Sequence, residues 1–134
     1  MALQHSERQP ALFTRFVVPL VLYVAGIFTL SAQPHLQLPI DFGNADKLYH
    51  FGEYGGLGLL IARAMRAFIP TRSTATRAVI AIGLGLAIAT SDEIFQSTVP
   101  GRQSSAFDAM ADTLGVALAQ WVYALWIRRR AVAR

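Results

Sequence analysis

The chain has 134 residues, enough for one domain, and 54% of them are hydrophobic while only 15% are charged. Soluble domains carry roughly 25% charged residues, so this composition favours a membrane protein. There is no cysteine, which excludes disulfides, zinc-thiolate sites and cysteine nucleophiles. The net charge is +4, but the arginines cluster between and after apolar stretches. That placement favours membrane topology over nucleic-acid binding, and we expect no nucleic-acid partner.

The first apolar stretch predicts a membrane-spanning helix over residues 13–32. Residues 16–40 contain no Asp, Glu, Lys or Arg, and a span needs about 20 apolar residues. Pro19 is compatible with the first turn of a helix. Residues 30–32 (Leu-Ser-Ala) are a poor signal-peptide cleavage site, so we expect this helix to be retained.

Three further helices are predicted over residues 46–69, 76–97 and 106–128. The connections between the predicted helices contain helix breakers, namely Pro34, Pro39, Gly43, Pro70, Pro100 and Gly101. No internal repeat or linker is visible. The predicted fold is therefore an all-α membrane protein, a four-transmembrane-helix bundle that forms a single domain over residues 1–134.

The arginines predict the orientation of this bundle. The N-terminus, the connection between the second and third helices, and the C-terminus hold all Lys and Arg residues except Lys47 and Arg102. The positive-inside rule therefore places both termini in the cytoplasm. Almost all acidic residues lie at the opposite, outer end.

Several of these acids are predicted to lie within the membrane. At 1.5 Å per residue, Asp92 is roughly 22 Å from Arg77 along the third helix, and Asp112 is roughly 24 Å from Arg128 along the fourth. The hydrocarbon core is about 30 Å thick. Exposing charged groups to lipid is costly, so we expect them to face inward or to line a wet cavity.

Helical spacing supports a shared inward face. The polar residues recur three or four positions apart within each helix: Asp46, His50 and Glu53 in the second helix, Asp92, Glu93 and Gln96 in the third, and Asp108 and Asp112 in the fourth. Small residues should let the helices approach closely; these are Gly52, Gly55, Gly56, Gly58, Gly83 and Gly85. Structural contacts between helices rarely need so many acids, so the pattern favours a functional cavity.

These residues resemble the motifs of the VanZ-like family. Residues 46–54 (DKLYHFGEY) resemble its D-K-x-x-H-F-x-x-Y signature, and residues 91–96 (SDEIFQ) resemble its S-D-E-x-x-Q motif. Pro100-Gly101-Arg102 followed by Asp108 resembles P-G-R…D. Residues 111–115 (ADTLG) resemble A-N-x-x-G, with Asp112 where the family usually has Asn. That extra charge does not suit a role that needs a neutral amide donor.

The resemblance covers about residues 10 to 128 and implies a small multi-pass protein of the bacterial inner membrane. The naming member of the family is associated with low-level resistance to the glycopeptide teicoplanin. We therefore expect an outward-facing polar cavity that binds or processes a cell-envelope lipid or lipid-linked glycan, with an effect on glycopeptide susceptibility.

As an enzyme, the chain would use His50 as the general acid or base, because its ordinary pKa is near neutral. Crowded carboxylates cannot all ionise, so one of Glu53, Asp92, Glu93 and Asp112 can serve as the acid. Lys47 and Arg102 would clamp a phosphate or carboxylate group at the mouth. The other expected substrate-binding residues are Asp46, Tyr54, Gln96 and Asp108. Ser91 is expected to be a helix hydrogen-bonding residue and not a nucleophile.

Two alternatives stay open beside catalysis. His50, Glu53, Asp92 and Asp112 are candidate ligands for a divalent metal, without a selection among magnesium, manganese, calcium and zinc. The chain could instead be a non-enzymatic membrane-binding or scaffold protein, or a small proton-coupled transporter. The sequence leaves open a homo-oligomer or a partner membrane protein.

Overall fold

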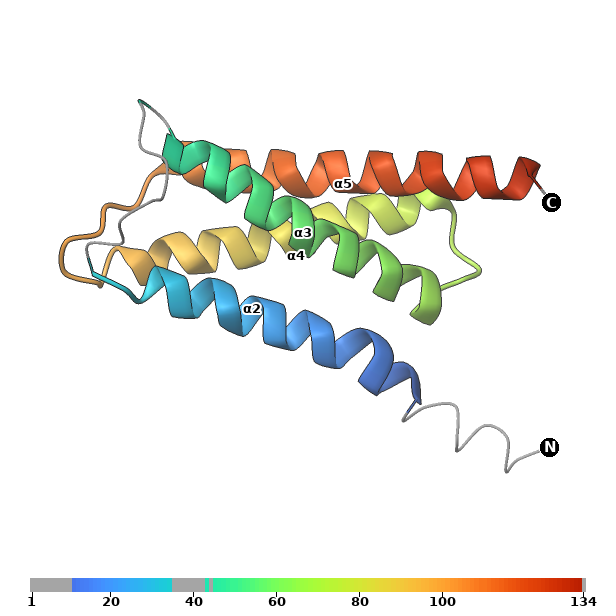
Figure 1. Cartoon of the computed structure of the whole chain (residues 1–134), viewed down its shortest axis with the longest axis horizontal. Coiled ribbons are helices and arrows are strands. Elements are labelled where there is room, and N and C mark those ends of the chain that lie inside the picture. Colours follow the sequence, from blue (N-terminus) through green and yellow to red (C-terminus); the bar gives the residue numbers. More distant parts are fainter. Residues whose placement is uncertain (1–10, 35–42, 44, 134) are drawn as a thin grey trace.

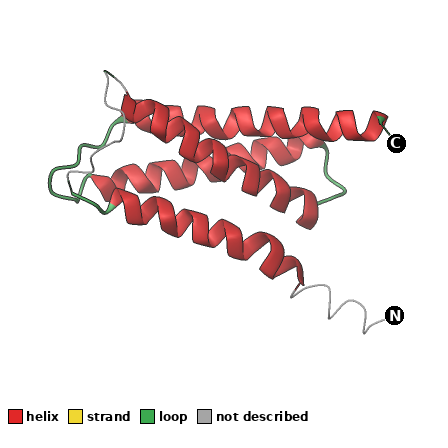
Figure 2. Cartoon of the chain, viewed as in Figure 1, coloured by secondary structure: helices red, strands yellow, loops and turns green. Residues whose placement is uncertain are grey.

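A computed structural model describes residues 11–34, 43 and 45–133, and within them the fold is all-helical with no strand. Figures 1 and 2 show long helical rods packed side by side. Along the chain they are η1 (Phe13–Val17), which continues directly into α2 (Val18–Ser31), then α3 (Ala45–Phe68), α4 (Thr74–Gln96) and α5 (Ala106–Val132). The all-α prediction is confirmed.

The helices begin and end within two residues of the predicted bounds, with one exception. Helix α5 extends to Val132, beyond the predicted end at residue 128. Its last turn contains Arg129 and Arg130, and arginine both favours helix and interacts well with the negative end of the helix dipole. The run of arginines therefore continues the helix instead of ending it.

The irregular start of the first helix and the starts of α4 and α5 have local causes. The π-helical turn η1 ends two residues before Pro19 of α2. The helix is irregular here because a proline has no N–H and its ring clashes with the carbonyl of the preceding turn. Helices α4 and α5 both begin after serine caps. The Ser73 side chain accepts a hydrogen bond from the Thr76 N–H, and the Ser105 side chain accepts one from the Phe107 N–H.

Helices α3 and α5 run parallel and are in close contact from their first turns to the middle of α3. Near the start of both helices, Lys47 binds Asp108. About three turns further on, the Gln120 side-chain amide donates to the Gly58 carbonyl at 2.8 Å. The residue numbers of the partners differ by 61 in the first pair and by 62 in the second. The two helices therefore keep one register.

Glycines make this contact possible. A Cβ atom on Gly115 would collide with the Phe51 carbonyl oxygen and would lie 3.0 Å from the Gly55 nitrogen. A Cβ atom on Gly58 would lie 2.9 Å from the Val116 Cα atom. The two backbones therefore touch directly, as in other packed membrane helices that place small residues at their interface.

The predicted role of the glycines is confirmed at some positions and wrong at others. A Cβ atom at Gly56 would collide with the Tyr23 hydroxyl of α2, and one at Gly85 would lie 2.7 Å from a methyl group of Val116. Gly52 and Gly83 have nothing within 4 Å of the added atom. These two glycines face away from the neighbouring helices, which the sequence pattern did not distinguish.

Three of the helices are long and apolar enough to cross a membrane, namely Phe13–Ser31, Thr74–Gln96 and Ala106–Val132. Large apolar side chains on them point outward, for example Val79 at 70% exposure. Helix α3 is not one of the three. It has five charged residues, namely Asp46, Lys47, Glu53, Arg63 and Arg66. The fourth span and the orientation of the termini therefore stay predictions.

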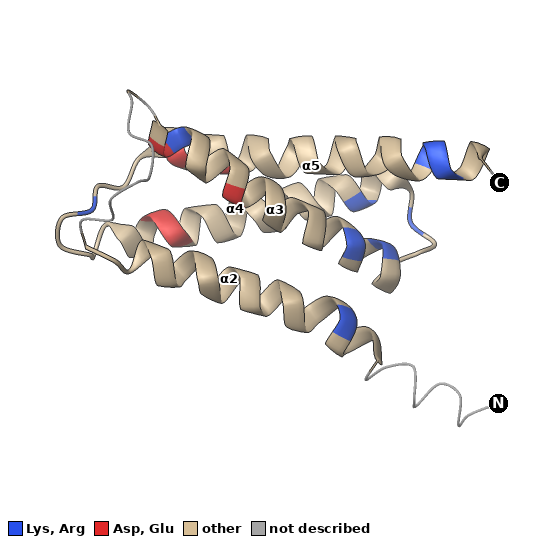
Figure 3. Ribbon diagram, in the orientation of Figure 1, with Lys and Arg blue, Asp and Glu red and all other residues tan. Residues whose placement is uncertain are grey.

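Charge is divided between the two ends of the bundle. Figure 3 shows the Asp and Glu positions toward one end and most Lys and Arg positions toward the other. We name the first the acidic end, formed by Asp46, Glu53, Asp92, Glu93, Asp108 and Asp112. We name the second the arginine end, formed by Arg15, Arg63, Arg66, Arg72, Arg77 and Arg128 to Arg130. The division agrees with the arrangement that the sequence predicted.

The glycine contact between α3 and α5 predicts that alanine substitutions at two glycines differ in their effect on stability. Gly115→Ala should destabilise the bundle by about 1–3 kcal/mol, because the added methyl group meets a backbone atom that cannot swing aside. Gly83→Ala is the matched control, since it lies within a helix with open space around it. Thermal unfolding in detergent should show a lower midpoint for Gly115→Ala alone, and equal midpoints for both variants would contradict the proposed contact.

Candidate functional site

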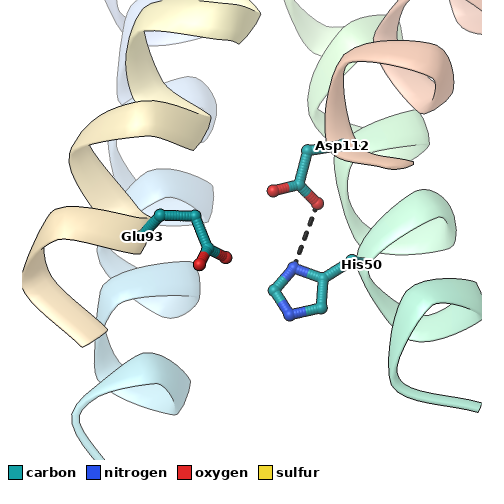
Figure 4. Close-up of side chains that lie close together, drawn as sticks. All are labelled: His50, Glu93 and Asp112. Carbon is teal, nitrogen blue, oxygen red and sulfur yellow. Dashed lines mark hydrogen bonds and ion pairs between the residues drawn. The ribbon is translucent and has the colours of Figure 1, made fainter. Parts of the chain in front are cut away.

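At the acidic end, three helices direct ionisable side chains toward one another. Figure 4 shows His50 of α3, Glu93 of α4 and Asp112 of α5 in this arrangement. The His50 Nδ1 atom forms a hydrogen bond with the Asp112 carboxylate at 3.1 Å. One ligand-type atom from each of the three residues lies within 4.8 Å of the others. We call these residues the three-helix cluster.

The glycine contact explains why His50 and Asp112 meet. His50 is next to Phe51, whose carbonyl oxygen faces Gly115, and Asp112 lies one helical turn before Gly115 on α5. The close approach of the two backbones therefore brings these side chains within hydrogen-bonding distance.

Glu93 connects the cluster to the start of α5. One of its carboxylate oxygens accepts a hydrogen bond from the Ser105 backbone N–H at 2.7 Å. Ser105 is the N-cap of α5, where a negative charge interacts favourably with the helix dipole. This bond holds the connection between α4 and α5 against the cluster.

The two carboxylates of the cluster are buried and their hydrogen bonding is incomplete. Asp112 is 0% exposed and Glu93 is 7% exposed. Each has one carboxylate oxygen, Asp112 Oδ2 and Glu93 Oε1, with no hydrogen-bond partner among the described residues. A buried carboxylate oxygen without a partner is costly. Protons, a cation or a ligand with donor groups would satisfy these atoms.

A second polar group connects α4 to α2. The Gln96 side-chain amide donates to the Asp92 carboxylate and to the Ser31 hydroxyl, both at 3.1 Å. All three residues are buried, and the Asp92 Oδ1 atom has no partner within the described part of the chain. Asp92 and Gln96 thus face the first helix, while Glu93 faces the three-helix cluster.

Lys47 is engaged by two acids. Its ammonium group donates to Asp46 at 2.9 Å and to Asp108 at 3.0 Å. Asp46 precedes it on α3 and Asp108 lies in the first turn of α5. An anionic ligand at Lys47 would therefore have to displace these carboxylates.

Arg102 is positioned by a tight turn. The Arg102 N–H donates to the Val99 carbonyl oxygen at 3.1 Å across Pro100 and Gly101, and Gly101 has φ of 81°. A turn with proline second and glycine third needs that positive φ, which other residues adopt poorly. In the described structure Arg102 forms no ion pair, and its buried Nε atom has no partner.

The remaining predicted site residues lie deeper in α3. Glu53 is half-buried and is outside the three-helix cluster. Its backbone carbonyl accepts a hydrogen bond from the Tyr23 hydroxyl of α2 at 2.9 Å. Tyr54 is fully buried in the core, and its hydroxyl has no partner among the residues described.

The cluster offers one imidazole and two carboxylates, a donor set that suits zinc or manganese. The predicted metal ligands were His50, Glu53, Asp92 and Asp112. The structure brings together His50 and Asp112 with Glu93, and it leaves Glu53 and Asp92 outside the group. Ligand atoms around one zinc ion lie about 3 to 4 Å apart, so the side chains would contract slightly around an ion.

Sequence reasoning missed two buried polar residues, Ser31 and Gln120. Ser31 binds Gln96 across the bundle, and Gln120 binds the backbone of α3. A lone serine or glutamine in an apolar helix carries no signal of its partner. Ser91 has the role that was expected, since its hydroxyl donates to the Ala87 carbonyl of its own helix at 2.8 Å.

Comparison with known proteins agrees with this architecture. The model of the VanZ/LLP1 family matches residues 4–127. No curated protein matches the chain, and no solved structure matches it. The matched segment includes every element of the described bundle except the last residues of α5. The chain belongs to the VanZ-like family.

Proposed function

We propose that this chain is a four-span protein of the bacterial inner membrane that binds or processes a cell-envelope lipid or lipid-linked glycan at its acidic end. The observation that carries the proposal is the buried three-helix cluster of His50, Glu93 and Asp112 with its unpartnered carboxylate oxygens. Within a membrane such groups mark functional sites more often than structural ones. In the proposed orientation the acidic end faces the outer leaflet, where these lipids and glycans are found.

The charge at this end limits which ligands fit. Six carboxylates lie there against Lys47 and Arg102, and Lys47 is already bound to two of them. A bare phosphate would be repelled by the remaining carboxylates. The site therefore favours ligands that bring hydrogen-bond donors, such as sugar hydroxyls, or a cation between the carboxylates and a phosphate. Arg102 is the basic residue that stays available to an anionic group.

A divalent metal would make a phosphate ligand acceptable. An ion held by the three-helix cluster would neutralise the two buried carboxylates and would leave positions for ligand oxygens. His50 would contribute its neutral imidazole. The same residues would act as acid and base if no metal is bound, so metal binding has to be measured directly.

Purified protein in detergent should bind manganese or zinc with one ion per chain. Asp112→Asn and Glu93→Gln should weaken binding about tenfold or more, because each removes a charged ligand. Asp46→Asn is the matched control, since it removes an acid from the same end outside the cluster. Equilibrium dialysis with metal analysis gives the affinities. Equal affinities for all four proteins would exclude the cluster as the metal site.

Lipid-linked glycan precursors and envelope lipids should bind saturably to the wild-type protein. His50→Ala should weaken binding or abolish turnover, because the imidazole is the neutral-pH acid–base group of the cluster. Ser91→Ala is the control, since Ser91 is exposed and bonded within its own helix. Mass spectrometry of the products separates the two roles: turnover identifies an enzyme, and binding without turnover identifies a binding protein. If the protein neither bound nor turned over any of these lipids, the proposal would be refuted.

The four-span topology predicts that both termini lie on the cytoplasmic side. Cytoplasmic reporters fused before Met1 and after Arg134 should both be active. If α3 did not cross the membrane, three spans would remain and the two reporters would lie on opposite sides. Two active periplasmic reporters would instead reverse the orientation and place the acidic end in the cytoplasm.

A further inference from the structure

A cavity lies at the arginine end, far from the three-helix cluster. Its volume is about 510 Å³, and residues of η1, α3 and α5 line it. Four of the lining residues are arginines, Arg15, Arg63, Arg66 and Arg130, and none is acidic. Figure 3 shows that this end of the described bundle carries basic residues and no acidic ones. Four positive charges around one cavity repel each other, so the cavity favours an anion.

Three of these four arginines contact aromatic rings instead of carboxylates. The Arg130 guanidinium lies 4.0 Å from the centroid of the Trp126 ring. Those of Arg15 and Arg63 lie 5.6 and 5.8 Å from the centroid of the Phe16 ring. These are cation–π distances. None of the four arginines forms an ion pair with an acid in the described part of the chain.

This arrangement keeps the guanidinium groups available. A cation–π contact uses the face of the guanidinium and leaves its N–H groups for an acceptor, and arginine N–H pairs match the geometry of phosphate oxygens. The lining also includes the rings of Tyr123 and Trp126. Such aromatic residues gather at the level of lipid headgroups in membrane proteins. The cavity therefore combines a phosphate-binding edge with an apolar wall at headgroup depth.

We propose that this cavity binds the phosphate headgroup of an anionic phospholipid from the leaflet that the arginine end faces. Basic pockets between membrane helices bind such headgroups in other proteins, and the volume suits a headgroup with its glycerol. The aromatic wall would contact the glycerol and the first carbons of the acyl chains. This site is separate from the acidic end and does not depend on what binds there. It requires only that the arginine end lies at the membrane surface.

The test uses the full chain purified in detergent, with phosphatidylglycerol and phosphatidylcholine of identical acyl chains as probes. Phosphatidylglycerol should raise the thermal midpoint of the wild-type protein and should remain bound in native mass spectrometry, while phosphatidylcholine should do neither. The double variant Arg63→Gln/Arg130→Gln should bind phosphatidylglycerol at least about tenfold more weakly. Arg63→Lys/Arg130→Lys keeps the charge but loses the paired N–H groups, so it should bind with intermediate affinity.

The matched control is Arg72→Gln/Arg129→Gln, which removes two charges from the same end outside the cavity lining. It should retain wild-type affinity. Equal losses in the cavity variant and the control would mean general charge attraction and would overturn the proposal, as would equal binding of the two lipids. If inorganic phosphate or glycerol phosphate alone raised the thermal midpoint as much as phosphatidylglycerol does, the cavity would be a site for a soluble anion and the lipid proposal would be overturned. If a variant fails to fold, native mass spectrometry of the wild-type protein still tests the proposal. Phosphatidylglycerol that remains bound supports it, and the absence of bound phosphatidylglycerol overturns it.

Discussion

The backbone contact between Gly115 of α5 and residues 51 and 55 of α3 sets the geometry on which the acidic end depends. No other residue type leaves room for two helices at this distance, because any Cβ atom would meet the Phe51 carbonyl oxygen. The contact fixes both the separation and the register of the two parallel helices. His50 then bonds to Asp112. Polar side chains that would be costly in lipid thereby find each other inside the bundle.

The bundle has its polar groups inside and its apolar groups outside, at least toward the acidic end. Ile94 and Leu114 point outward, while Asp92, Gln96 and Asp112 are buried. This is the arrangement expected when lipid is the solvent. The buried polar groups are only partly satisfied, however, since several carboxylate oxygens have no partner among the described residues. A core that was purely structural would be expected to pair these atoms, as most buried polar groups are paired.

The two ends of the bundle differ in their chemistry. At the acidic end, Glu93 and Asp112 are buried between α3, α4 and α5, and each has a carboxylate oxygen without a hydrogen-bond partner among the described residues. The arginine end is open, rich in donors and lined with aromatic rings. The first suits a cation or a hydroxyl-rich ligand, and the second suits a phosphate. The arginines from which the orientation is predicted therefore also line the cavity that we propose to bind a phospholipid headgroup.

The amino-acid sequence by itself determined the helices and the distribution of charge. Apolar length, proline and glycine breaks and the clustering of arginine are local properties, so the helix bounds were predicted to within two residues almost everywhere. The depth of the acids in the membrane, which follows from the fixed rise of a helix, stays a prediction.

Only the tertiary structure decided which neighbouring helix each side chain contacts. Asp92 and Glu93 are neighbours that differ by about 100° around the helix axis. Only the packing of α4 shows that Asp92 joins Gln96, which bonds to Ser31, while Glu93 faces His50. The pairing of Lys47 with Asp108 and the cavity around Arg63 and Arg130 likewise depend on helices far apart in the chain. Periodicity places a residue on a face of its own helix, but the partner of that face is set by how the helices pack.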